Sequence, residues 1–272
     1  DLGRDAGAGV AHQQLRVTAR PHAQVGLGER AVKLDGANPD LEAAAARMAP
    51  GPIMSTALAG VLVSRAGGAV AAALGETLAE GGLPVGVCLG FGSTTLDGSG
   101  AVTGDPGLAY GGTVGGGLLL PVEVGGDTRW ALLEAGTEGV TLTPSTPYDI
   151  SASVARVSLA NVAIPESRVL EGITTDHVHQ LFATLAAAEA AGVAEYTLTT
   201  AVEYAKIREQ FGRTIGSFQS IKHLAADMLC RTEQVRALAW DAAVAAEDLD
   251  AVLGVAHGVV EGQRPGDRRR DG

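Results

Sequence analysis

The sequence predicts an α+β protein in which a helical region, a β-rich middle domain and a second helical region follow one another. Between Gly81 and Ile150 there are only four alanines but 18 of the 38 glycines, and threonine and valine concentrate there too. Alanine dominates on both sides of this block. Since alanine is the best helix former, while glycine and β-branched residues favour turns and strands, the segregation marks three regions.

The expected domain boundaries follow from these shifts in composition. Residues 1–82 are expected to form an N-terminal helical region, of which 1–40 are poorly defined because their apolar residues show no period. Residues 83–170 would form the middle β domain, and residues 171–260 a C-terminal helical-bundle domain. The polar residues 261–272 are expected to be a disordered tail.

The composition of the 272 residues excludes several functional classes. A net charge of −11 argues against a nucleic-acid binder, because neutralising phosphates requires a positive field. Cys88 and Cys230 are the only cysteines, which argues against a disulfide scaffold and fits a cytoplasmic protein. The most apolar stretches are too short to cross a bilayer, so no membrane span is expected.

The first region should contain three helices. They are expected at Leu41–Met48, Thr56–Ser64 and Ala69–Ala79. Pro50 and Pro52 stop the first helix, and Gly81 ends the third.

The middle region predicts short strands separated by hairpin-type turns such as Asp97-Gly98 and Gly125-Gly126-Asp127. The strands are expected at Leu83–Leu89, Leu118–Val124, Thr128–Glu134, Gly139–Thr143 and Val154–Leu159. A small antiparallel barrel or sandwich is the expected arrangement.

The last region predicts two long helices. Asp176 is the expected N-cap of the first, which should run to about Ile207 before Gly212 and Gly216 interrupt it. Ser217 is the expected cap of the second. Two antiparallel helices are half of a four-helix bundle, so the bundle is expected to be incomplete.

Most other motifs have simple explanations. The glycine clusters at 86–92 and 111–117 lack the spacing of a dinucleotide fingerprint and the Lys-Ser or Lys-Thr of a P-loop, so they are interpreted as turns. The six histidines show no metal-ligand spacing, and no metal site is expected.

Glu203–Met228 is the stretch that indicates chemistry. Arg208 could hold a pyrophosphate in bidentate fashion, and the N-terminus of the second long helix would favour an anion nearby. Phe211 would offer a flat apolar contact to a nucleotide. An ordinary helix hairpin with a charged surface explains the same residues equally well.

This stretch resembles the C-terminal signature of the acyl-CoA dehydrogenase family. The family pattern is Tyr-x-x-x-Arg-x-Gln-Phe-Gly-x-x-Ile-x-x-Phe-Gln-x-Ile, followed by Leu-Ala-Asp-Met. The matching residues are Tyr204, Arg208, Gln210, Phe211, Gly212, Ile215, Phe218, Gln219 and Ile221, with Ala225–Met228 close to the ending. Weaker similarity extends over about Ala43–Glu247.

The resemblance implies helical, β and helical domains and a flavin enzyme that removes hydrogens from Cα and Cβ of an acyl-CoA thioester. It implies FAD bound between subunits, a homo- or hetero-oligomer with another acyl-CoA dehydrogenase chain, and electron-transfer flavoprotein as the acceptor. By position, Arg208, Gln210 and Phe211 would contact the pyrophosphate and adenine side of a neighbouring subunit's FAD. Phe218 and Gln219 would reach the same cofactor.

The sequence also departs from the family pattern. The loop that faces the flavin lacks its Glu-Pro at Leu89–Thr95, and Thr103–Leu108 replaces a later segment that covers the flavin. Phe182 stands near a position where a catalytic glutamate can occur, and Glu189 is the nearest carboxylate on that helix. The position usual for that glutamate has no counterpart here, so the catalytic residue is unassigned.

These departures resemble the degenerate subunits of heteromeric acyl-CoA dehydrogenases in actinobacterial steroid and lipid breakdown. Two functions therefore stay open at this point. The chain is an FAD-dependent acyl-CoA dehydrogenase or a subunit of one, or it is a non-catalytic structural partner or inactive fragment.

Overall fold

A computed structural model describes residues 39–246 except residues 48, 80–81, 91, 98–99, 113–115, 125 and 150. The predictions for residues 1–38 and for the tail lie outside the described residues. The first helical region contains α1 (Pro39–Ala45), α2 (Ile53–Ala66) and α3 (Gly68–Ala79). Gly67 and Gly68 have φ of 61° and 59°, and this backbone, which glycine adopts readily, separates α2 from α3.

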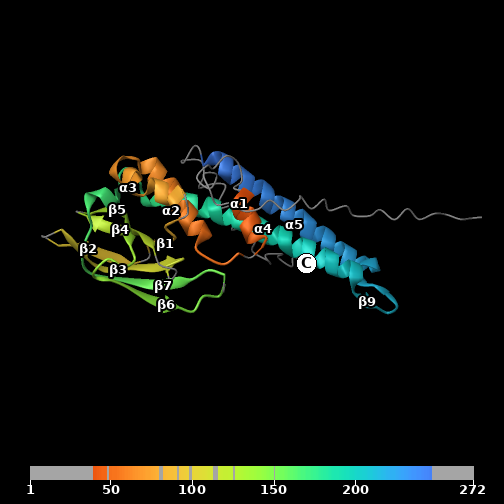
Figure 1. The fold of residues 1–272 in the computed structure, drawn as a ribbon. Helices are drawn as coiled ribbons and strands as arrows, with labels where there is room; N and C mark the ends of the chain where they lie inside the picture. Colours follow the sequence, from red (N-terminus) through yellow and green to blue (C-terminus); the bar gives the residue numbers. More distant parts are fainter. Residues whose placement is uncertain are drawn as a thin grey trace, which may run out of the picture.

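The middle region is a mixed eight-stranded sheet (Figure 1). Its strands are β1 (Val85–Cys88), β2 (Ser93–Leu96), β3 (Ala101–Tyr110), β4 (Gly117–Val124), β5 (Asp127–Glu134), β6 (Val140–Ser145), β7 (Val154–Ala163) and β8 (Val169–Leu170). The order is β6-β7-β3-β1-β4-β5-β8, with β2 paired to β3. The five predicted strands are all present, and β2, β3 and the short β8 are additional.

The α+β fold is confirmed, but of the expected antiparallel barrel or sandwich the closed barrel is not found, and the sheet is not wholly antiparallel. β1 runs parallel to β4, with Val85 opposite Gly117, and among the described strands no pairing joins β6 to β8 to close the sheet. The chain leaves β1 through the β2–β3 hairpin and returns beside β1 in the same direction. A tight turn cannot make such a pair, so local turn signals could not reveal it.

The sheet is bent, and its two faces belong to different cores. One core packs helices against Leu119, Trp130 and Leu132, and the other joins Leu118 and Leu120 of β4 to residues of β3 and β7. Successive residues of a strand point to opposite faces, which explains how β4 serves both cores. The backbone N–H of Glu123 donates to Thr94 Oγ1 at 3.0 Å and ties β4 to β2.

Two long antiparallel helices follow the sheet: α4 (Thr175–Ile207) and α5 (Gln219–Ala245). Figure 1 shows them side by side, with the far end of the pair projecting away from the sheet. Trp130 Nε1 donates to Thr175 Oγ1 at 3.3 Å and fastens the start of α4 to β5. None of the helices in the described part of the chain is long and apolar enough to cross a membrane.

Both predicted helix caps need correction. The N-cap of α4 is Thr174, not Asp176: Thr174 Oγ1 accepts from the His177 backbone N–H, and His177 Nδ1 accepts from the Thr174 N–H. Histidine thus takes the place of the glutamate or glutamine of the usual capping box. Ser217 does not cap α5, because a 3₁₀ turn over Ile215–Ser217 directs its hydroxyl to the Thr214 carbonyl oxygen at 2.7 Å.

Small residues allow α1 to pack closely on α4. A Cβ at Gly192 would overlap the Glu42 carbonyl oxygen and approach Ala45 Cβ. We expect Gly192→Ala to lower the free energy of unfolding by about 1–3 kcal/mol, because α1 must move away. Urea denaturation followed by circular dichroism measures this.

Gly75→Ala in α3 is the matched control. A Cβ there meets no atom within 4 Å, so this variant should gain about 0.5–1 kcal/mol. Equal effects of the two substitutions would contradict the close α1–α4 contact.

Candidate functional site

The tip of the helix hairpin is a tight turn that holds an aromatic side chain outward. We call residues 208–219 the hairpin tip. It contains β9 (Glu209–Gln210) and β10 (Arg213–Thr214), which pair in antiparallel fashion around Phe211-Gly212. Both central residues have positive φ, 53° for Phe211 and 72° for Gly212. A bulky residue seldom adopts this backbone, so Phe211 is strained, and its side chain is 89% exposed.

A second aromatic ring packs beneath Phe211. The rings of Phe211 and Phe218 meet edge to face with centroids 6.3 Å apart, and the Arg213 guanidinium lies 4.1 Å from the Phe218 centroid. The backbone N–H of Ile215 donates to the Arg208 carbonyl oxygen at 2.8 Å and closes the turn. The tip is therefore an ordered platform with one free aromatic edge.

The structure brings the five predicted cofactor residues together at this tip. Arg208, Gln210, Phe211 and Gln219 are exposed, and Phe218 is half-buried. Gln219 Nε2 lies 3.5 Å from His223 Nε2. Arg213 was not among the predicted residues, although an arginine within the aromatic stretch was a signal for a cation–π contact.

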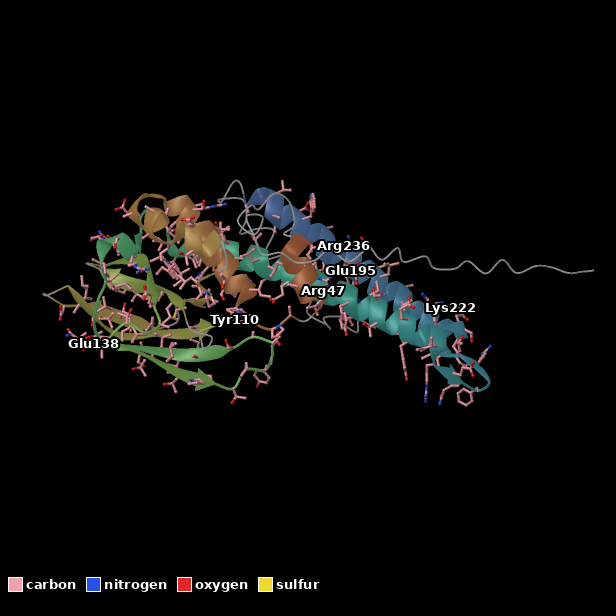
Figure 2. The ribbon with its side chains drawn as sticks, in the orientation of Figure 1. Arg47, Tyr110, Glu138, Glu195, Lys222 and Arg236 are labelled. Carbon is pink, nitrogen blue, oxygen red and sulfur yellow. The ribbon has the colours of Figure 1, made fainter. Side chains whose placement is uncertain are left out.

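The electrostatics of the tip suit a negatively charged nucleotide. The N-terminus of α5 has no side-chain cap, so its first N–H groups carry a partial positive charge toward solvent. Arg208, Arg213 and Lys222 are exposed nearby, and Figure 2 shows Lys222 near the far end of the hairpin. Guanidinium groups, free N–H groups and a flat aromatic face together fit the pyrophosphate and base of a dinucleotide. In the described part of the chain no three His, Cys, Asp or Glu side chains gather as metal ligands.

A second group lies where the sheet meets the helices. We call Tyr110, Phe182 and Glu189 the junction cluster, and Figure 2 shows Tyr110 at that end of the sheet. The rings of Tyr110 and Phe182 meet edge to face at 5.9 Å. Burial, and then the charges of Glu189 and Asp149, raise the pKa of Tyr110 to about 12. Burial also raises the pKa of Glu189, and Asp149 adds to that shift.

The two segments that depart from the family pattern lie side by side in the sheet. Ser93 of β2 pairs with Asp105 of β3, so Gly92–Thr95 and Thr103–Leu108 form one structural unit. His179 Nε2 lies 2.7 Å from the Leu89 carbonyl oxygen, which makes the ring nitrogen the donor and links α4 to the chain just before this unit. Sequence reasoning missed Tyr110 and His179, because their partners are distant in the chain.

The strain at Phe211 is testable. We expect Phe211→Asn to raise the free energy of unfolding by about 1 kcal/mol, because asparagine tolerates positive φ better than phenylalanine. Chemical denaturation gives the value. Gly212→Ala is the comparison, and it should be destabilised by about 1 kcal/mol at φ 72°. A less stable asparagine variant would contradict the strained turn.

The raised pKa of Glu189 gives a pH-dependent prediction. The folded state disfavours the charged carboxylate, so its contribution to stability is greatest below the usual glutamate pKa of 4.5 and falls as the pH rises through the raised value. Glu189→Gln stays neutral, so this variant should gain stability relative to the parent between pH 4 and pH 8. Thermal melting of both proteins across that range measures the difference. Glu171→Gln, at an exposed glutamate, serves as the control, and the same trend there would refute the assignment.

Sequence comparisons point to one family. The family profile described as "Acyl-CoA dehydrogenase, C-terminal domain" matches residues 181–257. Acyl-CoA dehydrogenase FadE34 of Mycobacterium tuberculosis is 41% identical over 210 residues, which cover 77% of this chain and 28% of the relative. Acyl-CoA dehydrogenase IpdE2 of the same organism is 33% identical over 72% of this chain and 52% of the relative. The chain thus spans about a quarter to a half of the length of these relatives.

Structural comparisons agree. The structure titled "Tcur3481-Tcur3483 steroid ACAD G363A variant" superimposes with a TM-score of 0.73 at 25% identity, over 85% of this chain and 69% of the other. The ChsE4-ChsE5 complex from M. tuberculosis gives 0.70 at 25% identity, over 80% and 63% of the two chains. Butyryl-CoA dehydrogenase from Megasphaera elsdenii, at 21% identity and a TM-score of 0.63 over 86% and 74%, shares the fold. With the ordered signature at the hairpin tip, these matches establish that the chain belongs to the acyl-CoA dehydrogenase family.

Proposed function

We propose that this chain is a subunit of an FAD-dependent acyl-CoA dehydrogenase that introduces a double bond between Cα and Cβ of an acyl-CoA thioester. The observation that carries this proposal is the hairpin tip, where all five predicted cofactor residues meet on an ordered, cationic and aromatic surface. FAD would supply the hydride acceptor. The chain's own residues would hold its nucleotide end.

The tip and the junction cluster are too far apart to serve one cofactor in one chain. From Phe182 to Arg208 the chain runs through 26 residues of α4 and its C-cap, which at about 1.5 Å per residue is ~39 Å. This exceeds the distance between the ends of one extended dinucleotide. The tip would therefore serve FAD whose flavin lies in another subunit, while the junction of this chain would face a cofactor held partly by its neighbour.

The chain's residues contribute binding and orientation in this proposal. Arg208 would pair with the pyrophosphate, and the rings of Phe211 and Phe218 would lie against the adenine side. Gln210 and Gln219 offer amide groups to the same end of the cofactor. Phe182, packed against Tyr110, cannot take a proton, so the base that removes the α proton would be another residue of this chain or a residue of the partner chain.

We further propose that the partner is another acyl-CoA dehydrogenase chain. Two of the similar structures are described as pairs of different chains, Tcur3481-Tcur3483 and ChsE4-ChsE5. The first half of α5 also leaves apolar surface open: Leu224 is 62% exposed, and no residue from Gln219 to Arg231 is buried. Such a face is typical of a helix that packs against another subunit. Electron-transfer flavoprotein as the acceptor and a cytoplasmic location stay predictions.

The test is co-expression with candidate acyl-CoA dehydrogenase partner chains from the same organism. The purified complex should be yellow and should reduce an artificial electron acceptor with some member of a panel of fatty and steroid side-chain acyl-CoAs. A colourless complex that reduces no acceptor with any member would overturn the proposal.

Arg208→Ala tests the assigned role of the tip. Loss of a charge-assisted contact to pyrophosphate costs about 1.5–3 kcal/mol, so FAD should bind about 10- to 150-fold more weakly. Flavin released on dilution, measured by fluorescence, reports the affinity. Arg236→Ala is the control, because Arg236 pairs with Glu233 at 3.2 Å and lies nearer the body in Figure 2. Unchanged retention in the Arg208 variant would contradict the role.

A further inference from the structure

Strand β3 carries an irregularity at its centre that one carboxylate stabilises. Its register against β7 shifts between Val102 and Gly104 and again between Gly104 and Gly107. Gly104 and Gly107 have φ of 142° and 106°, which side-chain-bearing residues rarely adopt. We call Gly104–Gly107 the β3 bulge.

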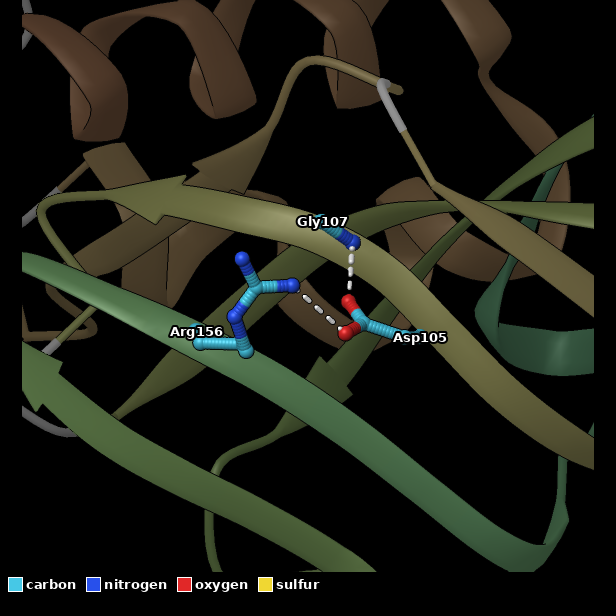
Figure 3. Close-up of polar contacts among 3 residues, drawn as sticks. All are labelled: Asp105, Gly107 and Arg156. Atoms are coloured by element: carbon cyan, nitrogen blue, oxygen red, sulfur yellow. Dashed lines mark hydrogen bonds and ion pairs between the residues drawn. The ribbon is translucent and has the colours of Figure 1, made fainter.

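Asp105 holds the bulge from both sides, as Figure 3 shows. Its Oδ1 accepts from the Gly107 backbone N–H at 2.8 Å, and its Oδ2 accepts from Arg156 Nη1 on β7 at 2.7 Å. The hydrogen bond from Arg156 is the main reason that the pKa of Asp105 is lowered. The carboxylate therefore replaces a regular ladder bond and joins β3 to β7 at the point where their register changes.

The backbone after β1 rests directly on this bulge. A Cβ at Gly92 would overlap the Asp105 carbonyl oxygen and lie 2.7 Å from the Gly107 nitrogen. A Cβ at Gly104 would likewise overlap the Ser93 carbonyl oxygen. Gly92 and Ser93 thus lie against the bulge, and the preceding Leu89 is linked to His179 of α4.

The Asp105–Arg156 ion pair contributes little to the stability of the whole fold. The Asp105 and Arg156 side chains are 41% and 57% exposed, and ion pairs so open to solvent contribute little to folding. A local role fits better, because a salt-bridged carboxylate fixes the bulge against which the backbone of Gly92 and Ser93 packs.

We propose that Asp105 and Arg156 are positioning residues: they fix the β3 bulge so that the backbone of Leu89, Gly90, Gly92 and Ser93 forms a rigid wall toward the flavin. This inference rests on the proposed function and on the family resemblance, which implies that the loop at Leu89–Thr95 faces the flavin ring. Neither residue contacts substrate or cofactor in this proposal. Both act through the backbone of the segment that they support.

Cys88 provides a readout that needs no cofactor. It directly precedes Leu89, is fully buried, and its pKa is raised to about 12 by burial and then by the charge of Asp105. Its thiol can react with a disulfide reagent only when the segment opens. The rate of Cys88 modification in a Cys230→Ser background, which removes the exposed thiol, therefore measures how firmly the wall is held.

The experiment compares Asp105→Ala, Asp105→Asn and Arg156→Gln with Arg156→Lys. We expect Cys88 modification to be about tenfold faster in the alanine variant, where both contacts are lost. Both Asp105 variants remove the charge that raises the pKa of Cys88, so the difference between them measures the opening of the segment: asparagine keeps an acceptor for the Gly107 N–H and should be slower than alanine. Lysine at position 156, which keeps the charge, should lie close to the parent. Arg231→Ala, which breaks another exposed pair at 3.1 Å on α5, should leave the rate unchanged.

The visible absorption band of FAD in the co-purified complex is the second readout, and it should shift in Asp105→Ala and Arg156→Gln. Unchanged rates of Cys88 modification in Asp105→Ala and Arg156→Gln would overturn the positioning role.

Faster Cys88 modification with an unchanged flavin absorption band would overturn the placement of the wall at the flavin. If the parent complex holds no flavin, the proposed function fails, and the thiol rates still decide whether Asp105 positions the segment. If the Asp105 variants do not fold, Arg156→Gln decides alone.

Discussion

The structure depends on one long helix that is held firmly at only one end. The start of α4 is fastened to the sheet through Trp130 and His179, and Gly192 lets α1 pack on its middle. Just before that point, Ala187 and Ala191 pack against Ala239 and keep α4 and α5 close, and beyond it α4 still has α5 as its neighbour. The abundance of small residues is therefore a packing requirement, since bulkier side chains would separate the helices on which the tip stands.

The backbone strain at Phe211 is explained by the exposed aromatic ring that the hairpin tip carries. A two-residue turn with positive φ at both positions is the shortest way to reverse the chain between β9 and β10, and glycine or asparagine would form it with less strain than Phe211. Phenylalanine there costs stability and gains nothing from burial at 89% exposure. Strain of this kind indicates a functional constraint. A ring that must meet a ligand outside its own chain is such a constraint.

The sequence predicted elements wherever local chemistry decides the structure. Continuous apolar runs such as Leu118–Val124 became strands, and the alanine-rich runs became helices. The sequence-based predictions failed where a residue's partner is distant in the chain or is of an unusual type. β3 was missed because Gly104, Asp105, Pro106 and Gly107 interrupt the apolar pattern of a strand, whereas in the structure Gly104 and Asp105 pair with Thr94 and Ser93 of β2. The parallel β1–β4 pair and the histidine capping box have no local signal of the usual kind.

The residues of the candidate site also fall into two groups, one that the sequence could predict and one that it could not. The tip residues lie within twelve positions of one another, so a dense motif could identify them all, whereas Tyr110, Phe182 and Glu189 meet across a domain boundary. The separation of about 39 Å along α4 then imposes a further condition on the proposed function. The hairpin tip and the junction cluster of one chain cannot bind the two ends of the same FAD molecule. If the chain works as a dehydrogenase subunit, cofactor binding and assembly must be coupled, and affinity for flavin should depend on the concentration of the partner chain.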